Sequence, residues 1–381
     1  MGMKDLENIV AFPSVSWSHN WERQHEFIYR LSDKVSGKSY VHPPLGLINH
    51  SPIEILRKIR RQRQHSSELP KSSNPRKENI EFLQPRIIPY HYLCPIDTFN
   101  SNQILSATPV ALDNSLVYAT YANGAILRIL KKSPLSVLDL AQRRQVSAHL
   151  SDRAKKTEKE AVRTASLVFA DSMATVRDYQ DIRPDIHYLP QGCDPDRFSG
   201  VSPDREVLEK ARSFKGVIGY AGTDIVMDYG ILTNLIQQLP DYLFVLVGDL
   251  KQGESRGLKE LPNVFLPGRQ PFEKLGSFYA TFDLGLIPYK RNQHTDGVFP
   301  TKYFEYLSAG VPVLSSQLPD LVALNGPGTA LSDLEHEWPD LALQLLTNRG
   351  SSREELRNFA AQNSWAARFE ELWRQIELLP K

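Results

Sequence analysis

The sequence predicts an α/β protein built from two doubly wound domains, each with a parallel sheet between helices. Three observations support this prediction. Short runs rich in β-branched and aromatic residues alternate with longer stretches of helical periodicity. The chain between successive runs is long enough for a crossover, so the strands can pair in parallel. The alternation stops near residue 200 and then starts again, and 381 residues are enough for two domains.

The first half of the chain contains one predicted helix that is well marked by its apolar stripe. Phe27, Ile28, Leu31 and Val35 recur there at helical spacing. The predicted strands are residues 8–12, 39–42, 87–90, 115–119, 136–140, 167–170 and 186–189. Together they predict a first domain over residues 1–198.

The second half begins after Cys193 to Pro203, a stretch of turn residues without periodicity that predicts a linker. The second domain is expected over residues 199–353. Its predicted strands are residues 217–221, 243–247, 264–266, 284–287 and 313–315, and its predicted helices include residues 229–239. Residues 354–381 are expected to form one or two helices with an apolar stripe. Such a stripe is normally a docking face, and we expect it to pack back on the first domain. That stripe is made of Trp365, Phe369, Leu372, Trp373 and Ile376.

Composition excludes several classes of protein. The 45 Lys and Arg residues balance 44 Asp and Glu residues, which argues against a surface built as a whole for nucleic acid. There is no run of 18 apolar residues and no signal-like start, so a cytoplasmic protein without a membrane span is expected. Cys94 and Cys193 are too few for a disulfide framework, and both are expected to be buried.

A basic insertion, residues 57–77, interrupts the alternation. It contains eight Lys and Arg residues and one acid, Glu68, so its net charge is +7. A solvated insertion explains this composition. The first alternative is a patch for anionic lipid headgroups at the inner face of a membrane, or for an anionic acceptor, and the second is a contact with nucleic acid.

The residues from His294 to Ser316 (HTDGVFPTKYFEYLSAGVPVLSS) carry the strongest functional signal. Thr301 can cap a helix that has Lys302 in its first turn and Glu305 on the same face, and that ends at Gly310. A helix N-terminus with a lysine suits a diphosphate, and a carboxylate one turn deeper can accept hydrogen bonds from a ribose. The alternative is an exposed ion pair between Lys302 and Glu305.

The stretch PTKYFEYLSAGVPVLSS resembles the donor-binding signature of GT-B glycosyltransferases. It is most similar to family-four enzymes and to the bacterial xanthan-type glucuronosyltransferases and teichuronic-acid glycosyltransferases. Other stretches fit in the same order, over roughly residues 155 to 375. They are SLVFADS (166–172), LPQGCD (189–194), IGYAG (218–222), YATFDLGLIPY (279–289), and Ser364-Trp365 with Arg368. The resemblance implies two Rossmann-like domains facing a cleft, with the C-terminal helix crossing back to the first.

The resemblance also implies a donor site in the second domain. Lys302 would hold the donor phosphates and Glu305 the ribose, while Gly222 and Thr223 would let backbone approach the diphosphate. Arg269 lies where the family reads the base, although a solvated arginine explains it equally well. The remaining candidates for donor binding are His294, Asp296 and Tyr303.

Two departures from the family pattern affect the stereochemistry. Gly297 stands where retaining family-four enzymes carry an acid that contacts the sugar, and Asp296 is the nearest acid. The first loop of the second domain also lacks the family's phosphate-binding Arg/Lys pair. Both departures favour the inverting branch. The resemblance further implies that lysine and helix dipole neutralise the leaving nucleotide, so no metal and no cofactor are expected.

An inverting transfer needs a general base from the first domain. Asp139, at the end of a predicted strand, is the first candidate, and His19 is the second. The loop that contains His19 resembles acceptor-reading loops of related enzymes, which makes Trp17, Asn20, Arg23 and His25 candidates for acceptor binding. A solvated or capping role for Asp139 is the alternative.

The predicted function is transfer of a sugar from a nucleotide-diphosphate sugar, such as a UDP-sugar, to an acceptor hydroxyl. The acceptor would be a saccharide or a lipid-linked saccharide in bacterial polysaccharide or glycoconjugate synthesis. Two alternatives are a sugar-nucleotide epimerase on the same fold and a non-catalytic binding protein.

Overall fold

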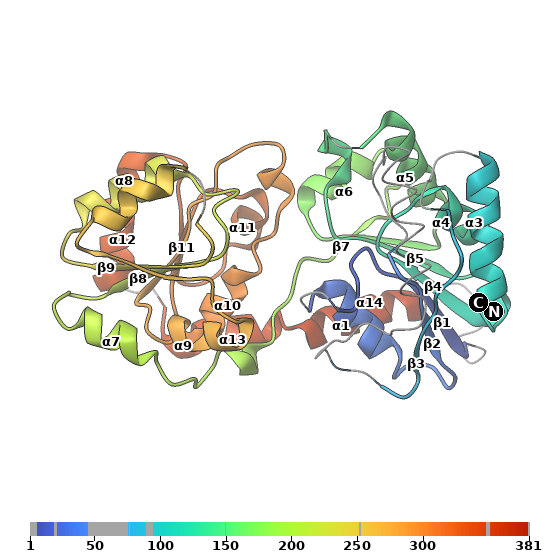
Figure 1. Ribbon diagram of the computed structural model, residues 1–381, viewed down its shortest axis with the longest axis horizontal. Coiled ribbons are helices and arrows are strands. Elements are labelled where there is room, and N and C mark those ends of the chain that lie inside the picture. The colour runs from blue at the N-terminus through green and yellow to red at the C-terminus, as the bar shows by residue number, and fades with distance from the viewer. Residues whose placement is uncertain are drawn as a thin grey trace. The chain divides into compact units, whose positions relative to one another are not determined.

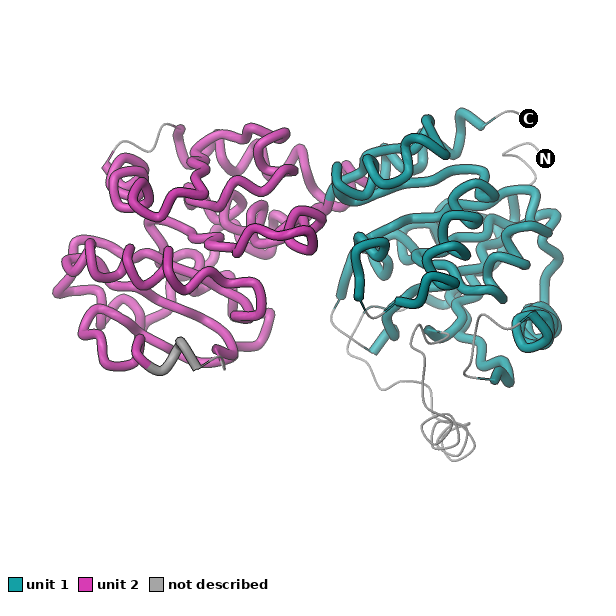
Figure 2. Tube along the Cα trace, turned by 90° about the horizontal axis from the view of Figure 1, so that it is seen from above, with its two compact units in different colours: residues 1–190, 369–381 teal, residues 191–368 magenta. Residues whose placement is uncertain are grey.

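The computed structural model describes residues 6–18, 21–44, 75, 77–88, 94–148, 150–250, 253–347 and 351–379. The chain divides into two compact units (Figure 2). The first contains residues 1–190 and 369–381, and the second contains residues 191–368. The division at Pro190 lies a little before the predicted boundary at residue 198.

The first unit has a seven-stranded sheet in the order β3-β2-β1-β4-β5-β6-β7, and every pair of neighbours is parallel. Its strands are β1 (Asn8–Phe12), β2 (Ser39–Val41), β3 (Ile80–Phe82), β4 (Ser115–Ala119), β5 (Ser136–Leu140), β6 (Leu167–Ala170) and β7 (His187–Tyr188). Its helices are α1 (Arg23–Leu31), α3 (Cys94–Ala107), α4 (Gly124–Leu130), α5 (Asp152–Thr164) and α6 (Met173–Tyr179).

The second unit has a six-stranded parallel sheet in the order β10-β9-β8-β11-β12-β13. Figure 1 labels its strands β8, β9 and β11. Its strands are β8 (Val217–Ala221), β9 (Leu243–Val247), β10 (Val264–Gly268), β11 (Leu284–Ile287), β12 (Val313–Ser315) and β13 (Thr329–Leu331). Its helices are α7 (Arg205–Ala211), α8 (Tyr229–Gln238), α9 (Leu275–Tyr279), α10 (Lys302–Ala309), α11 (Pro319–Leu324), α12 (Trp338–Thr347) and α13 (Arg353–Gln362).

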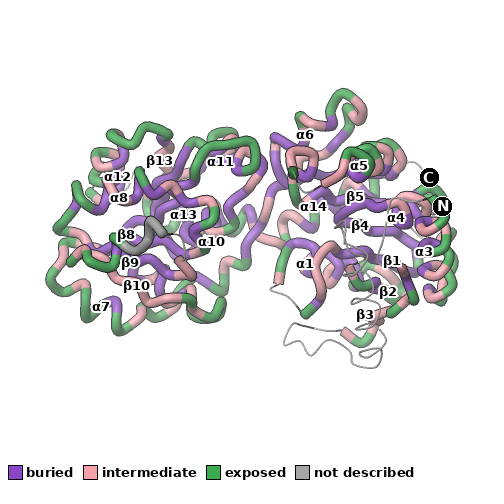
Figure 3. Tube along the Cα trace, turned by 45° about the horizontal axis from the view of Figure 1, so that its top comes forward, coloured by how far each residue is buried: buried purple, intermediate pink, exposed green. Residues whose placement is uncertain are grey.

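The central strands of both sheets are buried along their whole length. Every residue of β4 and β5 in one unit, and of β8 and β9 in the other, is buried (Figure 3). Strands covered on both faces read as continuous apolar runs rather than as alternating ones. This explains why LFVLV of β9 could be recognised as a strand from sequence.

The C-terminal segment is shared between the units. α13 packs against α10 within the second unit, whereas the prediction assigned all of residues 354–381 to the first. α14 (Trp365–Glu377) enters the first unit from Phe369 onward. Phe369 lies 6.2 Å from the Phe27 ring between centroids, and Lys34 stacks on both Phe369 and Trp373. The predicted stripe is buried at Phe369, Leu372, Trp373 and Ile376.

Three sequence-based expectations for the first unit are wrong. Residues 87 and 88 are not in a strand, and residues 89 and 90 lie outside the described residues; the edge strand is β3, whose middle residue is Glu81. Helix α1 ends at Leu31, before Val35. Cys94 is exposed at the start of α3, where Arg128 Nη2 lies 3.0 Å from its Sγ, whereas Cys193 is buried as expected.

Each sheet reverses its strand order once, and ligands of open α/β sheets bind outside the carboxyl ends of the strands at such a point. In the first sheet the reversal lies between β1 and β4, and in the second between β8 and β11. These two edges are therefore the places to look for a site.

Candidate functional site

The carboxyl edge of the second sheet gathers the candidate donor residues. Gly222 and Thr223 follow β8, Arg269 follows β10, and Tyr289 follows β11. Helix α10 begins at Lys302, and the contacts of that lysine place it at the ends of β8 and β11. The site is therefore at the strand-order reversal of this sheet.

Helix α10 presents its first turn to this edge. Tyr303, Phe304, Tyr306 and Leu307 face the core and are buried, whereas Lys302 and Glu305 are half-buried. Gly310 ends the helix as predicted, with a left-handed φ of 76°. Thr301 occupies the N-cap position, but its side chain makes no capping hydrogen bond, contrary to the prediction. Its hydroxyl therefore does not compete with a ligand for the backbone N–H groups of the first turn.

Lys302 is held by tyrosines. Its Nζ donates a hydrogen bond of 2.8 Å to the Tyr289 hydroxyl. It also lies 4.6 Å from the ring centroid of Tyr220 and 4.9 Å from that of Tyr289. Burial lowers the pKa of Lys302, but the phenol oxygens of these tyrosines and of Tyr306 more than offset it, so the pKa lies above its ordinary value. Lys302 is thus a fixed positive charge at neutral pH.

Glu305 does not pair with Lys302, so the alternative of a simple ion pair between them is excluded. Its Oε2 accepts a hydrogen bond of 2.9 Å from the Tyr279 hydroxyl. Burial raises the pKa of Glu305, although Tyr279 and Lys302 partly counter the effect. The ammonium and the carboxylate therefore face the same edge with separate tyrosine partners, and both can meet one ligand.

Two glycines make room for a close approach of backbone. Gly222 has a φ of 150°, and a Cβ built there would lie 2.8 Å from Lys302 Nζ and 2.9 Å from the Tyr220 hydroxyl. Gly248 has a φ of 143°, and its Cβ would lie 1.8 Å from the carbonyl oxygen of Gly222. Any side chain at Gly248 would displace the Gly222 backbone. Gly222 therefore does more than allow a turn, because a side chain there would collide with Lys302 and Tyr220.

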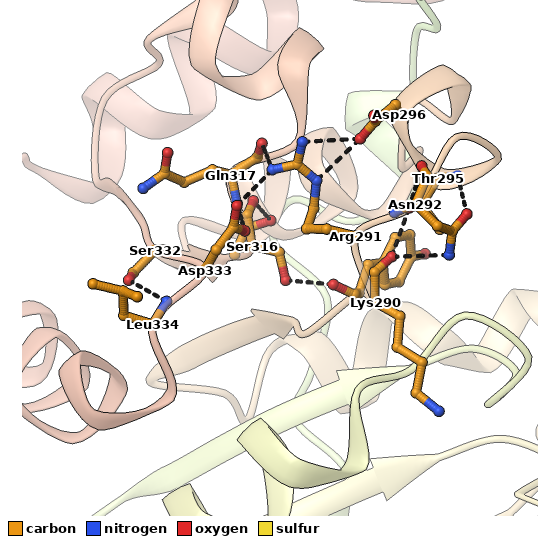
Figure 4. A network of polar contacts seen from close by, with 12 residues as sticks. Lys290, Arg291, Asn292, Thr295, Asp296, Ser316, Gln317, Ser332, Asp333 and Leu334 are labelled. Carbon is orange, nitrogen blue, oxygen red and sulfur yellow. Dashed lines mark hydrogen bonds and ion pairs between the residues drawn. The ribbon is translucent and has the colours of Figure 1, made fainter.

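Arg291 braces the loop that precedes α10 (Figure 4). Its Nε and Nη2 donate to Asp296 Oδ1 over 3.1 and 2.9 Å, and its Nη1 donates to Asp333 Oδ2 over 2.7 Å. Nη1 also donates to the carbonyl of Gln317. One guanidinium thus connects the loop after β11 with the segments after β12 and β13.

The other expected donor residues fall into two groups. Asp296 Oδ1 accepts from Arg291, and the side chain is partly exposed, so its contact with the sugar stays a prediction. Tyr303 is fully buried, and its hydroxyl pairs with Thr329 Oγ1 at 2.9 Å, so its expected donor contact is wrong. Thr223 and Arg269 are exposed at the carboxyl edge. His294 is exposed in the braced loop.

Asp139, the predicted general base, is buried in a network of its own. Its two oxygens accept from Arg23 Nε and Nη2 over 2.8 to 3.1 Å, and Oδ2 accepts from the Tyr118 hydroxyl over 2.7 Å. Arg23 Nη1 donates in addition to the carbonyls of Leu189 and Pro190. Both side chains are at most 2% exposed. Neither can reach a substrate in this arrangement, so both are structural residues and the predicted roles are corrected.

Trp17 and His25 are likewise structural. His25 is fully buried, with Nδ1 accepting from Glu22 N over 3.0 Å and Nε2 3.1 Å from the Ser16 carbonyl. Trp17 is 2% exposed, and its Nε1 donates to the Pro75 carbonyl. They pack together with ring centroids 5.3 Å apart and support the segment between β1 and α1. The expected acceptor contacts of both are therefore corrected, while His19 and Asn20 lie outside the described residues.

Sequence reasoning missed the tyrosines that hold the donor residues. Tyr220 and Tyr289 lie 82 and 13 residues before Lys302, and Tyr279 lies 26 residues before Glu305. Only the strand order brings these residues together. A usable signal existed for two of them. Tyr220 lies near the end of β8, and Tyr289 lies just beyond the end of β11.

Among the described residues, no group of three or more His, Cys, Asp and Glu side chains lies close enough to hold a metal ion. No helix in that part of the chain is long and apolar enough to span a membrane.

Known proteins resemble this chain in part of its sequence and in its fold. No protein-family model matches the chain. A stretch of 151 residues is 30% identical to TuaH of Bacillus subtilis strain 168, assigned as a teichuronic acid biosynthesis glycosyltransferase. The match spans 38% of this chain and 38% of TuaH, so less than half of either protein is compared.

Solved structures match nearly the whole chain. HepE of Anabaena in complex with UDP is 18% identical, with a TM-score of 0.65 over 97% of this chain and 99% of HepE. Sucrose-phosphate synthase of Thermosynechococcus elongatus is 13% identical, with a TM-score of 0.64 over 97% of this chain and 99% of its own. Trehalose-phosphate synthase of Burkholderia xenovorans, solved with glucose-6-phosphate, is 11% identical, with a TM-score of 0.65 over 97% and 100%. The fold is therefore GT-B, as the sequence predicted.

Proposed function

We propose that this protein is a glycosyltransferase that moves a sugar from a nucleotide-diphosphate sugar to an acceptor hydroxyl. The observation that carries the proposal is the position of Lys302 and Glu305, which both lie in the first turn of α10 at the strand-order reversal of the second sheet. The structures of HepE with UDP and with UDP-glucose, and the stretch shared with TuaH, support the same assignment.

Lys302 and the first turn of α10 would hold the diphosphate. The ammonium is charged at neutral pH, and the helix N-terminus adds a partial positive charge. As the bond between sugar and diphosphate breaks, negative charge grows on the departing oxygen, where both groups stabilise it. We therefore propose that the transfer needs neither a metal nor a cofactor.

Glu305 would bind the ribose, because a carboxylate can accept from both vicinal hydroxyls. Tyr279 keeps its Oε2 in place. Gly222 and Gly248 would admit the diphosphate to the backbone at the end of β8, and the exposed Arg269 would approach the base. His294 and Thr223 border the same edge.

The acceptor oxygen would attack the anomeric carbon of the bound donor. A new carbon–oxygen bond forms, the bond to the diphosphate oxygen breaks, and the acceptor hydroxyl loses its proton. Asp139 is not the base for that proton, because Arg23 and Tyr118 occupy its oxygens. His19 stays a candidate from sequence.

We further propose that the acceptor is a saccharide, and that it is lipid-linked in polysaccharide synthesis. The basic insertion 57–77, which lies outside the described residues apart from Pro75 and Lys77, would then attach the protein to the inner face of an anionic membrane. Replacing Arg57, Lys58, Arg60, Arg61 and Arg63 by Gln should release the protein from phosphatidylglycerol vesicles at 0.1 M salt. Unchanged binding would contradict this part.

The enzyme assignment is tested by product analysis. The protein is incubated with UDP-, GDP-, ADP- and dTDP-sugars, with and without saccharide acceptors, and free nucleoside diphosphate is measured. Acceptor-dependent release from one donor, lost in Lys302→Ala, is the expected result. An isomerised sugar nucleotide without release would identify an epimerase, and binding without any turnover would identify a binding protein.

A further inference from the structure

The Tyr289 hydroxyl has an unused proton at the candidate site. Its oxygen lies 2.8 Å from Lys302 Nζ. An ammonium group can only donate, so the tyrosine oxygen must be the acceptor of this hydrogen bond. The phenol proton must then point elsewhere, and no acceptor for it lies among the described residues. Yet Tyr289 is only 6% exposed.

A hydroxyl on a largely buried side chain is destabilising when it has no acceptor. Such a group is expected to have a partner that is present only in the working state. The Tyr289 hydroxyl lies next to the ammonium that would hold the donor phosphates, so the partner is expected to be an anion.

The position of Tyr289 is firmly held. Its backbone bridges to Met227, and its carbonyl accepts from Ser316 Oγ over 2.8 Å. Its ring also contacts the Lys302 ammonium. The hydroxyl is therefore fixed in advance, as a group that stabilises developing charge must be.

The loop after β8 makes a further donor necessary. Its residues Thr223 to Asp228 include two acids, Asp224 and Asp228, and no Lys or Arg. Asp224 is buried with the Tyr229 hydroxyl at 2.9 Å from its Oδ2. The loop after β8 therefore adds no positive charge to that of Lys302. A ligand with two phosphates needs further hydrogen-bond donors at the end of β8.

We propose that Tyr289 donates its phenol proton in a hydrogen bond to the diphosphate of the donor and of the leaving nucleotide. It accepts from Lys302 and donates to the ligand, so the two side chains act as one unit. This assignment rests on the proposed function and adds a binding residue to it. Because a hydrogen bond to a charged group is the stronger kind, removing the hydroxyl should affect the diphosphate and not the nucleoside.

The test is calorimetric titration with UDP and with uridine. Four forms of the full chain are compared: wild type, Tyr289→Phe, Lys302→Ala and the double variant. Tyr289→Phe should bind UDP about ten- to hundred-fold more weakly than wild type, while uridine affinity changes less than about two-fold. The preserved ring and the uridine affinity report that the variant is folded. Tyr242→Phe, just before β9 at the opposite edge of the sheet, is the matched control.

The double variant separates a direct contact from an effect through Lys302. If Tyr289 contacts the diphosphate, Lys302→Ala with Tyr289→Phe should bind UDP more weakly than Lys302→Ala alone. Equal affinities, or a Tyr289→Phe variant that binds UDP like wild type, overturn the inference while leaving the proposed function standing. If wild type binds neither UDP nor GDP, ADP or dTDP, the proposed function and this inference fall together.

Discussion

Arg23 and Asp139 form a buried bidentate ion pair that connects the start of α1 with β5. Arg23 Nε and Nη2 both donate to the carboxylate, and the Asp139 side chain is fully buried. Burial lowers the pKa of Arg23, but the Asp139 carboxylate raises it above its ordinary value, so Arg23 is charged. Removing one partner leaves the other charge buried and alone.

Asp139→Ala should therefore destabilise the protein by about 3–5 kcal/mol. Chemical denaturation with guanidinium measures this. Replacing both partners, as in Arg23→Met with Asp139→Leu, should recover much of the loss, because two apolar side chains need no ion pair. If Asp139→Ala keeps full stability and loses only turnover, Asp139 is a catalytic base after all.

His42 should make stability depend on pH. It is fully buried at the end of β2, stacked on Phe12 with ring centroids 4.8 Å apart, and its Nε2 lies 3.1 Å from Thr108 Oγ1. Burial lowers the pKa of His42 to about 3. The unfolded chain takes up this proton near pH 6.5, so stability is complete above that pH. The contribution of His42 to the free energy of unfolding falls by about 1.4 kcal/mol per pH unit as the pH falls toward 3.

The His42 prediction is checked by the change in denaturation midpoint between pH 7 and pH 5 in wild type, His42→Gln and His336→Gln. The His42 variant should lose part of the dependence. The variant of His336, which is exposed, should retain all of it. Identical profiles for wild type and His42→Gln would contradict the prediction.

Glu305 should lower the stability of the folded protein at neutral pH and strengthen the binding of UDP. Its pKa is raised by burial, so the folded state binds the proton more tightly than the unfolded chain. Stability therefore falls as the pH rises through the pKa of the folded state. Glu305→Gln should raise the melting temperature at pH 7 and weaken binding of UDP, because the ribose loses a charged acceptor. Calorimetry that shows unchanged UDP affinity would remove Glu305 from the site.

Gly248→Ala should impair nucleotide binding indirectly, because the added methyl group displaces backbone and does not itself contact the ligand. The added methyl group would collide with the Gly222 carbonyl, so the backbone at the end of β8 must move. We expect a lower melting temperature and at least a ten-fold loss of UDP affinity. Gly200→Ala is the control, since Gly200 also has a positive φ, of 69°, but a Cβ there meets no atom within 4 Å. Equal effects of the two variants would show that backbone strain, not the collision, matters.

Much of the fold was predictable because its central strands are locally distinctive. Runs such as VIGYA of β8 and LFVLV of β9 are apolar throughout, since helices cover both faces of a parallel sheet. The edge strand β3 was missed because its three residues, IEF, include a charged one. Its place depends on pairing with β2 rather than on its own sequence.

The site was predictable only where its residues are close in sequence. Lys302 and Glu305 share one helix turn, and Gly310 ends that helix, so the signature predicted them together. Arg23, the partner of Asp139, is 116 residues away, so the sequence around Asp139 gives no sign of a buried ion pair. Tyr289 and Lys302 are separated by 13 residues and a loop braced by Arg291. No local pattern specifies that contact.

Binding of a nucleotide sugar's diphosphate by Lys302 is tested by titration of wild type and Lys302→Ala with UDP, GDP, ADP and dTDP, with the parent nucleosides as controls. One diphosphate should bind wild type and should bind Lys302→Ala at least ten-fold more weakly, while the nucleoside binds both alike. Equal affinity of both proteins for that diphosphate would show that Lys302 does not bind it.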